Sequence, residues 1–136
     1  MSQDYAATGK YTTLTFDQLK DSMARVEGVG VVATVNEDGT PNAGIFVPMM
    51  PDCEHIVMVL AKNRTRANIE RTGHAALVYD VVDTAAADKA DQHRGARMSL
   101  ELIRPDEKEY AKVAEHYDRL NDYSLLFRIT DTALIG

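Results

Sequence analysis

Runs of apolar and β-branched residues, separated by polar turns, predict six β-strands along the chain. The stretch at 30–35 is rich in β-branched residues, and the run at 56–60 is apolar throughout, as expected of a strand buried on both faces. Asp38 and Gly39 predict a hairpin between the first two strands, because glycine adopts the positive φ of a tight turn without strain. The six predicted strands span residues 30–35, 40–50, 55–61, 74–82, 95–103 and 124–130.

Helical spacing predicts three short helices around these strands. Thr15 followed three residues later by Gln18 is a capping-box pattern, so the first helix is expected to begin there. A second helix is predicted over residues 64–72 with Gly73 as its C-cap, and a third is predicted to open at Pro105. The expected apolar faces are Phe16, Leu19, Met23 and Val26 in the first helix, and Tyr110, Val113, Ala114, Tyr117 and Leu120 in the third.

Two segments carry no clear period. Residues 1–14 are polar and predict an N-terminal arm that is ordered only where something packs on it. Residues 84–93 alternate small and charged side chains and predict a mobile loop. Together the elements predict one mainly β (α+β) domain over residues 1–136, a six-stranded antiparallel barrel with peripheral helices.

Composition and charge narrow the classes of function. The 136-residue chain has a formal net charge of −6, which argues against general binding to nucleic acids or anionic membranes. No apolar run is long enough to span a bilayer, and the N-terminal residues lack the pattern of a secretory signal. A single cysteine, Cys53, fits a reducing compartment, so we expect a cytoplasmic location. Its acidic neighbours raise the pKa of a thiol, which disfavours a nucleophilic role.

Several patterns with known chemistry are missing from the sequence. It contains neither of the glycine-rich phosphate loops of nucleotide-binding folds, nor the nucleophile elbow of hydrolases. The four histidines lack both the helical pairing and the cysteine partners that a zinc site needs. We therefore predict no metal site and no catalytic residue.

A cationic segment joins the third strand to the second helix. Lys62, Arg64 and Arg66 lie with Thr65 where this helix is expected to begin. A helix N-terminus presents free N–H groups and the positive end of the helix dipole, so this cluster is a good seat for a phosphate. A solvated, positively charged connector is the alternative.

At this point the sequence resembles the pyridoxamine 5′-phosphate oxidase-like, FMN-binding split-barrel proteins, above all the small bacterial FMN-binding flavoproteins of that group. The resemblance lies in VVATVNEDGTPNA at 31–43, an apolar strand, RTRANI at 64–69, and a further strand at 75–79. It covers about residues 25–103, and it implies a split β-barrel. Arg-Thr stands at 64–65 where the family more often has Arg-Lys.

The resemblance also implies a cofactor site. Arg64 and Thr65 would bind the FMN phosphate, and Asn68 would support them. Arg97, with its neighbour Arg94, would reach the cofactor of a partner subunit. The residues implied to flank the flavin are Ile45, Phe46, Val47 and Pro48 beside the isoalloxazine, and Leu60, Ala61 and Lys62 beside the ribityl chain and ring.

The function implied is that of an FMN-binding homodimer, with the cofactor at the subunit boundary. It would act as an oxidoreductase, a flavin reductase or an electron carrier, because the flavin itself carries the hydride or electron chemistry. Two alternatives stay open. One is the same barrel binding another cofactor, such as haem, a deazaflavin or pyridoxal phosphate. The other is a non-enzymatic dimeric binding module.

Overall fold

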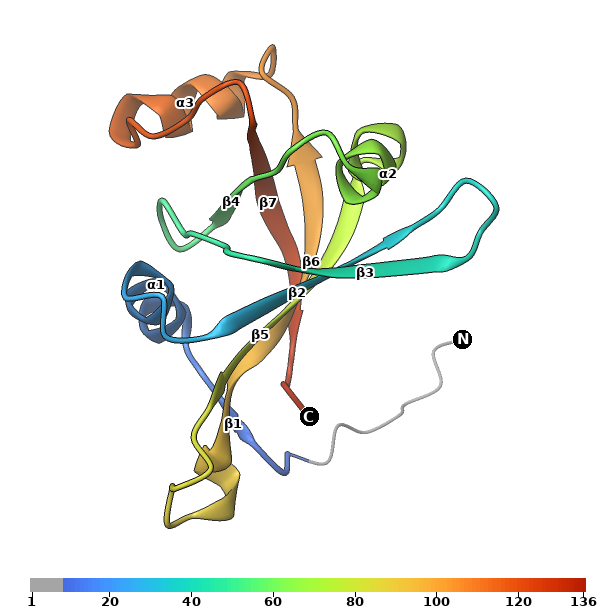
Figure 1. Ribbon diagram of the computed structural model, residues 1–136. Coiled ribbons are helices and arrows are strands. Elements are labelled where there is room, and N and C mark those ends of the chain that lie inside the picture. Colours follow the sequence, from blue (N-terminus) through green and yellow to red (C-terminus); the bar gives the residue numbers. More distant parts are fainter. Residues whose placement is uncertain (1–8) are drawn as a thin grey trace.

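The computed structural model describes residues 9–136, in which six long strands form a curled antiparallel sheet with three α-helices around it (Figure 1). The sheet order is β3-β2-β5-β6-β7-β4. This architecture confirms the predicted mainly β barrel with peripheral helices. The strands are β2 (Val29–Val35), β3 (Pro41–Phe46), β4 (His55–Val59), β5 (His74–Val82), β6 (His93–Ile103) and β7 (Ser124–Ala133).

The β2–β3 hairpin forms where the sequence predicted it. Gly39 takes a φ of 85° in the connecting turn, and the Asp38 carboxylate accepts hydrogen bonds from the backbone N–H and hydroxyl of Thr40. The register pairs Thr34 with Asn42 and Val31 with Ile45. Because side chains alternate across a strand, the polar pair and the apolar pair lie on opposite faces of the sheet.

The barrel closes only partly between its two edge strands. β4 pairs with β7 on one side, whereas on the other it exchanges backbone hydrogen bonds with Met49 alone, through Val57. Pro48 precedes this bridge and cannot donate a ladder hydrogen bond, which limits further pairing. β3 accordingly ends at Phe46, earlier than the predicted strand at 40–50.

The first helix, α1 (Phe16–Ala24), has the predicted capping box. The Thr15 hydroxyl accepts from the Gln18 backbone N–H, and the Gln18 side chain accepts from the Thr15 N–H. Leu19 and Met23 are buried as predicted. Val26 was placed wrongly on this face, because the helix has already ended and Val26 lies exposed with a φ of 52°.

The last residues of the predicted N-terminal arm pack on the sheet. Its first eight residues lie outside the described chain, but Thr12–Thr13 form a short strand, β1, which pairs in parallel with β6. The Leu14 N–H continues this pairing to the Gly95 carbonyl, and its side chain packs on the core. The edge of β6 supplies the hydrogen-bond partners of β1, and the polar sequence of this segment does not indicate that pairing. The segment predicted as a mobile loop contains a 3-10 turn, η1 (Lys89–Gln92).

The other two helices are α2 (Arg64–Thr72) and α3 (Lys108–His116). α2 has the predicted bounds and its predicted cap, Gly73, which is left-handed with a φ of 76°. α3 begins three residues after Pro105 and buries only Val113 fully. Figure 1 shows α2 and α3 at one end of the sheet, and β1 with η1 at the other. None of the helices within residues 9–136 has the length and hydropathy needed to cross a bilayer.

A buried tyrosine joins α1 to the sheet. Tyr79 is 1% exposed, and its hydroxyl lies 2.7 Å from the Ser22 Oγ. The same hydroxyl accepts a hydrogen bond of 3.0 Å from the Gly28 N–H. The Ser22 hydroxyl of α1 and the Gly28 N–H after the helix therefore share this single oxygen as their hydrogen-bond partner.

We predict that Tyr79→Phe destabilises the protein by about 1–3 kcal/mol, since it leaves Ser22 and the Gly28 N–H without a partner. Urea unfolding followed by circular dichroism measures the change. Tyr123→Phe is the matched control, because Tyr123 is 56% exposed. Equal stability of the two variants would contradict this role of the hydroxyl.

Candidate functional site

The N-terminus of α2 leaves two backbone N–H groups without intrahelical partners. Asn63 is the N-cap: its side chain accepts from the Arg66 N–H at 2.9 Å, and its carbonyl accepts from Ala67. An α-helix has four orphan N–H groups at its start, so those of Arg64 and Thr65 stay available to a ligand. They carry the positive end of the helix dipole.

This helix start opens on a cavity of about 660 Å³ beside the β2–β3 hairpin. Its volume lies in the range of small-molecule sites, about 300–1,000 Å³. Two of the predicted cations, Lys62 and Arg64, are exposed and line it. The cavity residues are Asn36, Glu37, Asp38, Thr40, Lys62, Asn63, Arg64, Ala67, Asn68 and Arg71.

Behind the cavity, a network of buried amides and hydroxyls fixes α2 to the hairpin. Thr65 is 5% exposed, and its hydroxyl oxygen accepts from the Asn42 amide at 3.0 Å. Asn68 is 3% exposed and donates to Thr34 at 3.1 Å and to Asn36 at 2.9 Å. Thr65 and Asn68 thus face the sheet, and Asn68 also borders the cavity.

The sequence reasoning missed the partners of this network. Thr34 and Asn42 occupy opposed positions on the inner face of the hairpin, and Asn42 also donates to Thr34 at 3.2 Å. Arg71 donates to the Asn68 side chain at 3.0 Å and to the Val35 carbonyl. The available signal was polar residues at inward positions of otherwise apolar strands.

Arg66 differs from the other cations of the segment. Its guanidinium donates to the carbonyls of Leu60 and Tyr123, at 2.8 and 3.0 Å, and its Nε pairs with Glu70 at 2.8 Å. Only 14% of the side chain is exposed. Arg66 therefore fastens α2 to the ends of β4 and β7, and the suggestion that it supplies charge for an anion does not fit this geometry.

The predicted flavin-flanking residues divide between two faces. Ile45 and Val47 point outward and are 73% and 58% exposed, whereas Phe46 packs against the core and Pro48 is buried. Leu60 is also buried, at 1% exposed, and Ala61 after it is exposed.

Arg97 lies on the outer face of the sheet, away from the helix start. Its Nε donates to the Leu134 carbonyl at 2.7 Å. One row of the register runs from Ile45 through Val31 and Val78 to Arg97. Three strand spacings separate the ends of this row, about 14 Å, so Arg97 and Ile45 of one chain do not meet.

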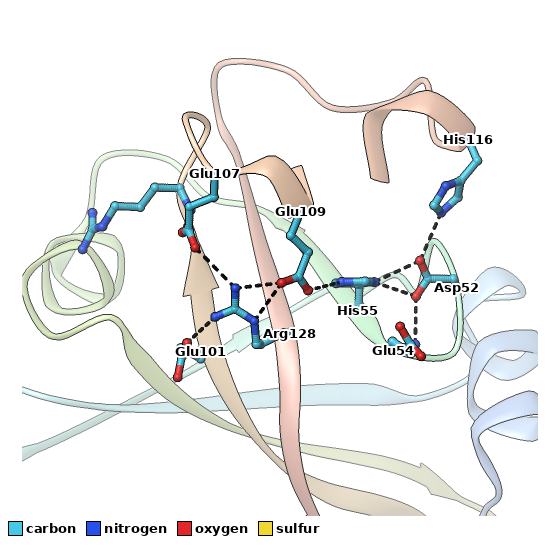
Figure 2. Close-up of polar contacts among 9 residues, drawn as sticks. Asp52, Glu54, His55, Glu101, Glu107, Glu109, His116 and Arg128 are labelled. Carbon is cyan, nitrogen blue, oxygen red and sulfur yellow. Dashed lines mark hydrogen bonds and ion pairs between the residues drawn. The ribbon is translucent and has the colours of Figure 1, made fainter. Parts of the chain in front are cut away.

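A second polar cluster lies between α3 and the barrel wall, as Figure 2 shows. His55 is 6% exposed and sits between two carboxylates, Asp52 and Glu109. Glu109 also accepts two hydrogen bonds from Arg128. Within residues 9–136, no group of three or more His, Cys, Asp or Glu side chains has the geometry of a metal site.

Comparisons with known proteins bear on the fold. No protein-family model and no curated protein matches the sequence. Among solved structures, an FMN-binding protein from Syntrophomonas wolfei superposes with a TM-score of 0.58 at 18% identity, over 87% of this chain and 84% of the other.

Two further structures have the same architecture. A proposed pyridoxamine 5′-phosphate oxidase from Lactobacillus delbrueckii gives a TM-score of 0.57 at 22% identity, over 88% of this chain and 93% of its own. The haem storage protein HutZ from Vibrio cholerae gives 0.53 at 14% identity, over 89% and 95%. These likenesses show the fold alone: this chain has the split-barrel architecture of these proteins.

The two classes of cation predict different effects of mutation. Arg66→Met should destabilise the protein by about 1.5–3 kcal/mol, because it removes charged hydrogen bonds to main-chain carbonyls. Arg64→Met, at an exposed position, should change stability by less than about 0.5 kcal/mol. Urea unfolding of both variants tests this, and a loss at Arg64 as large as that at Arg66 would contradict the division.

Proposed function

We propose that this split-barrel protein binds FMN, with the phosphate seated at the N-terminus of α2, and acts as an oxidoreductase, flavin reductase or electron carrier. One observation carries the proposal: the helix start, with its two orphan N–H groups and two exposed cations, opens on a cavity of about 660 Å³. A dianionic phosphate has the charge and the acceptor oxygens that such a site suits.

The residues around the helix start fit a phosphate. The N–H groups of Arg64 and Thr65 would donate to it, and the side chains of Lys62 and Arg64 would neutralise it. The Thr65 hydroxyl accepts from Asn42 and faces the sheet, so Thr65 would contribute its backbone N–H rather than its side chain. Glu37 and Asp38 also border the cavity. Their negative charge would repel a phosphate. The phosphate would therefore lie next to the helix and away from the hairpin turn.

The exposed apolar face of the sheet supports a homodimer. The row Ile45, Val31 and Val78 is flanked by Val29 and Val47, and all five lie on the outer face. A contiguous apolar face of this kind is typical of an interface. A second copy covering it would bring its own Arg97 toward the cofactor of the first, which one chain cannot do across three strands.

When bound, the flavin supplies the hydride or electron chemistry. The chain would hold the phosphate through Lys62, Arg64 and Thr65, and would keep α2 fixed through Asn68. Ile45 and Val47, covered by a partner, would exclude water from the ring. No acid or base of the chain is assigned a catalytic role.

The positions of the histidines favour a flavin over haem. A histidine is a usual axial ligand of haem iron. None of the four histidines lines the cavity at α2. His55 and His116 contact Asp52, and His93 contacts Asp80, whereas His74 is exposed at the start of β5.

We also propose a cytoplasmic location, because the single cysteine, Cys53, cannot form a disulfide within this sequence. Its thiol donates to an Asp17 carboxylate oxygen at 3.2 Å, and this hydrogen bond raises the pKa of the thiol. A thiol kept protonated is a poor nucleophile and oxidises slowly. The residue therefore acts as a packing and hydrogen-bonding group in this proposal.

We predict that Arg64→Met weakens FMN binding by at least about tenfold, because a charge-assisted hydrogen bond to the phosphate contributes about 1.5 kcal/mol or more. Riboflavin, which lacks the phosphate, should bind the variant and the wild type equally. Quenching of flavin fluorescence measures both affinities.

Lys112→Met is the matched control, since Lys112 is an exposed cation on α3. It should leave both affinities unchanged. If the purified wild-type protein neither retains FMN nor quenches its fluorescence, the proposed function is wrong. If Arg64→Met weakens riboflavin as much as FMN, the phosphate is seated elsewhere.

The dimer carries a separate prediction. Ile45→Asp should convert the dimer to a monomer, because it places a charge at the centre of the proposed interface. Sedimentation velocity measures the mass against the 15.0 kDa chain. Val59→Asp is the control, at a residue that is 59% exposed but lies on β4. A monomeric wild-type protein would overturn the dimer.

A further inference from the structure

His55 lies with both ring nitrogens against carboxylates. Its Nδ1 is 2.8 and 2.9 Å from the two oxygens of Asp52, and its Nε2 is 2.6 Å from Glu109 (Figure 2). A neutral imidazole has one N–H, whereas an imidazolium has two. Carboxylates accept only, so this geometry is fully satisfied only when His55 is protonated.

The two carboxylates come from different parts of the fold. Asp52 belongs to the β3–β4 connection, where the Glu54 backbone N–H holds it at 2.8 Å. Glu109 lies in the first turn of α3. His55, on β4, therefore bridges the barrel wall and α3. His116, in the last turn of α3, reaches the same Asp52 at 3.0 Å.

α3 has few other attachments to the barrel. Val113 is its single fully buried residue, and its N-cap residue, Glu107, makes no side-chain capping hydrogen bond. Tyr110, together with Tyr117 and Leu120 after the helix, is only partly buried against the small cluster around Val113. The polar contacts of Glu109 and His116 are thus a large part of what holds this helix.

The balance of charge around His55 depends on its proton. Arg128, its register partner on β7, contacts Glu109 at 2.8 Å, Glu107 at 3.3 Å and also Glu101 of β6. With Asp52 on the other side of His55, four carboxylates contact Arg128 or His55, and Arg128 is the permanent cation among them. Protonated His55 supplies the second cation at the centre, and its loss leaves like charges facing one another. Glu54 and His116 complete the titratable groups of the cluster.

We propose that this cluster is a pH-sensitive clip, in which protonated His55 holds α3 on the barrel and its deprotonation releases the helix. The inference is independent of the proposed flavin site. It concerns another cavity, of about 610 Å³, between α2 and α3. Tyr110 and Ala114 of α3, with Leu120 after it, line this cavity. Release of α3 would remove that wall, so pH would control access to the cavity.

The direction of the effect follows from the pKa values. Burial alone lowers the pKa of His55, but hydrogen bonds to Glu109 and Asp52 outweigh it, and the pKa lies above its ordinary 6.5. The stability that this adds is complete below pH 6.5 and is lost as the pH rises through the folded-state pKa.

The carboxylates set the acid limit. Arg128 is the main cause that lowers the pKa of Glu109 below its ordinary 4.5. For Asp52, burial alone raises the pKa, but the Glu54 N–H and His55 outweigh it and the net shift is downward. Their contribution is present above the ordinary values and is lost as the pH falls through the lowered ones. The clip is therefore tightest in mildly acidic solution.

Hydrogen exchange of the full chain, measured by mass spectrometry without flavin and corrected for intrinsic rates, tests the clip. Protection of α3 should fall between pH 6.5 and the folded-state pKa of His55, by up to about tenfold per pH unit because one proton is released, and should level off above that pKa. Protection of α2 should stay constant. The NMR signal of the His55 ring gives the midpoint of its titration in the same samples, and the loss of protection should end near that midpoint.

Variants separate the clip from general loss of stability. His55→Gln should abolish the pH dependence and leave α3 weakly protected throughout. Glu109→Gln, at a partly exposed position, should keep the fold and move the midpoint to lower pH, because it removes one stabilising charge. Glu115→Gln, the same change at an exposed position of α3, is the matched control and should keep the midpoint. A pH-independent α3, α2 and α3 losing protection together, or an unchanged midpoint in Glu109→Gln would overturn the proposal.

Discussion

The position of α2 on the β2–β3 hairpin rests on buried hydrogen bonds between side-chain amides and hydroxyls. Thr34, Thr65 and Asn68 are buried and Asn42 is half-buried, so the buried groups must find a partner in the protein or destabilise the fold. They find one another, because the hairpin register places Thr34 opposite Asn42 directly beneath the helix. This requirement fixes where the helix begins, and so where its dipole and free N–H groups point.

The cations of the chain divide according to what they contact. Arg66 and Arg71 donate to main-chain carbonyls and to side chains of the fold, and Arg128 lies among three glutamates. These charges are satisfied within the protein and hold elements together. Lys62 and Arg64 lie on the surface of a cavity instead. A cationic stretch of sequence thus contains both structural and ligand-facing charges. Which role a cation has depends on whether main-chain carbonyls lie within its reach.

The elements of the fold could be read from local patterns. The hairpin at Gly39, the capping box at Thr15 and the glycine cap at Gly73 all depend on residues within four positions of one another, and all are present. The two differences arose where a distant partner decides and where a helix ends. The strand at Thr12 needs the edge of β6, and Val26 left the predicted helical face because the chain turns after Arg25.

For the candidate site, the sequence by itself determined that a cationic helix start follows a buried strand, since strand burial and helix capping are local properties. The order of its elements also indicated an antiparallel barrel, and the resemblance to the split-barrel proteins indicated the kind of barrel. Only the tertiary structure decided which cations face the cavity, that Thr65 and Asn68 turn toward the hairpin, and that His55 stands between Asp52 and Glu109. Asn68 and its partner Thr34 lie 34 positions apart, and His55 and Glu109 lie 54 apart. The physical reason is that hydrogen bonds and desolvation depend on which groups meet in space, and residues so distant in the chain meet only once the sheet has closed.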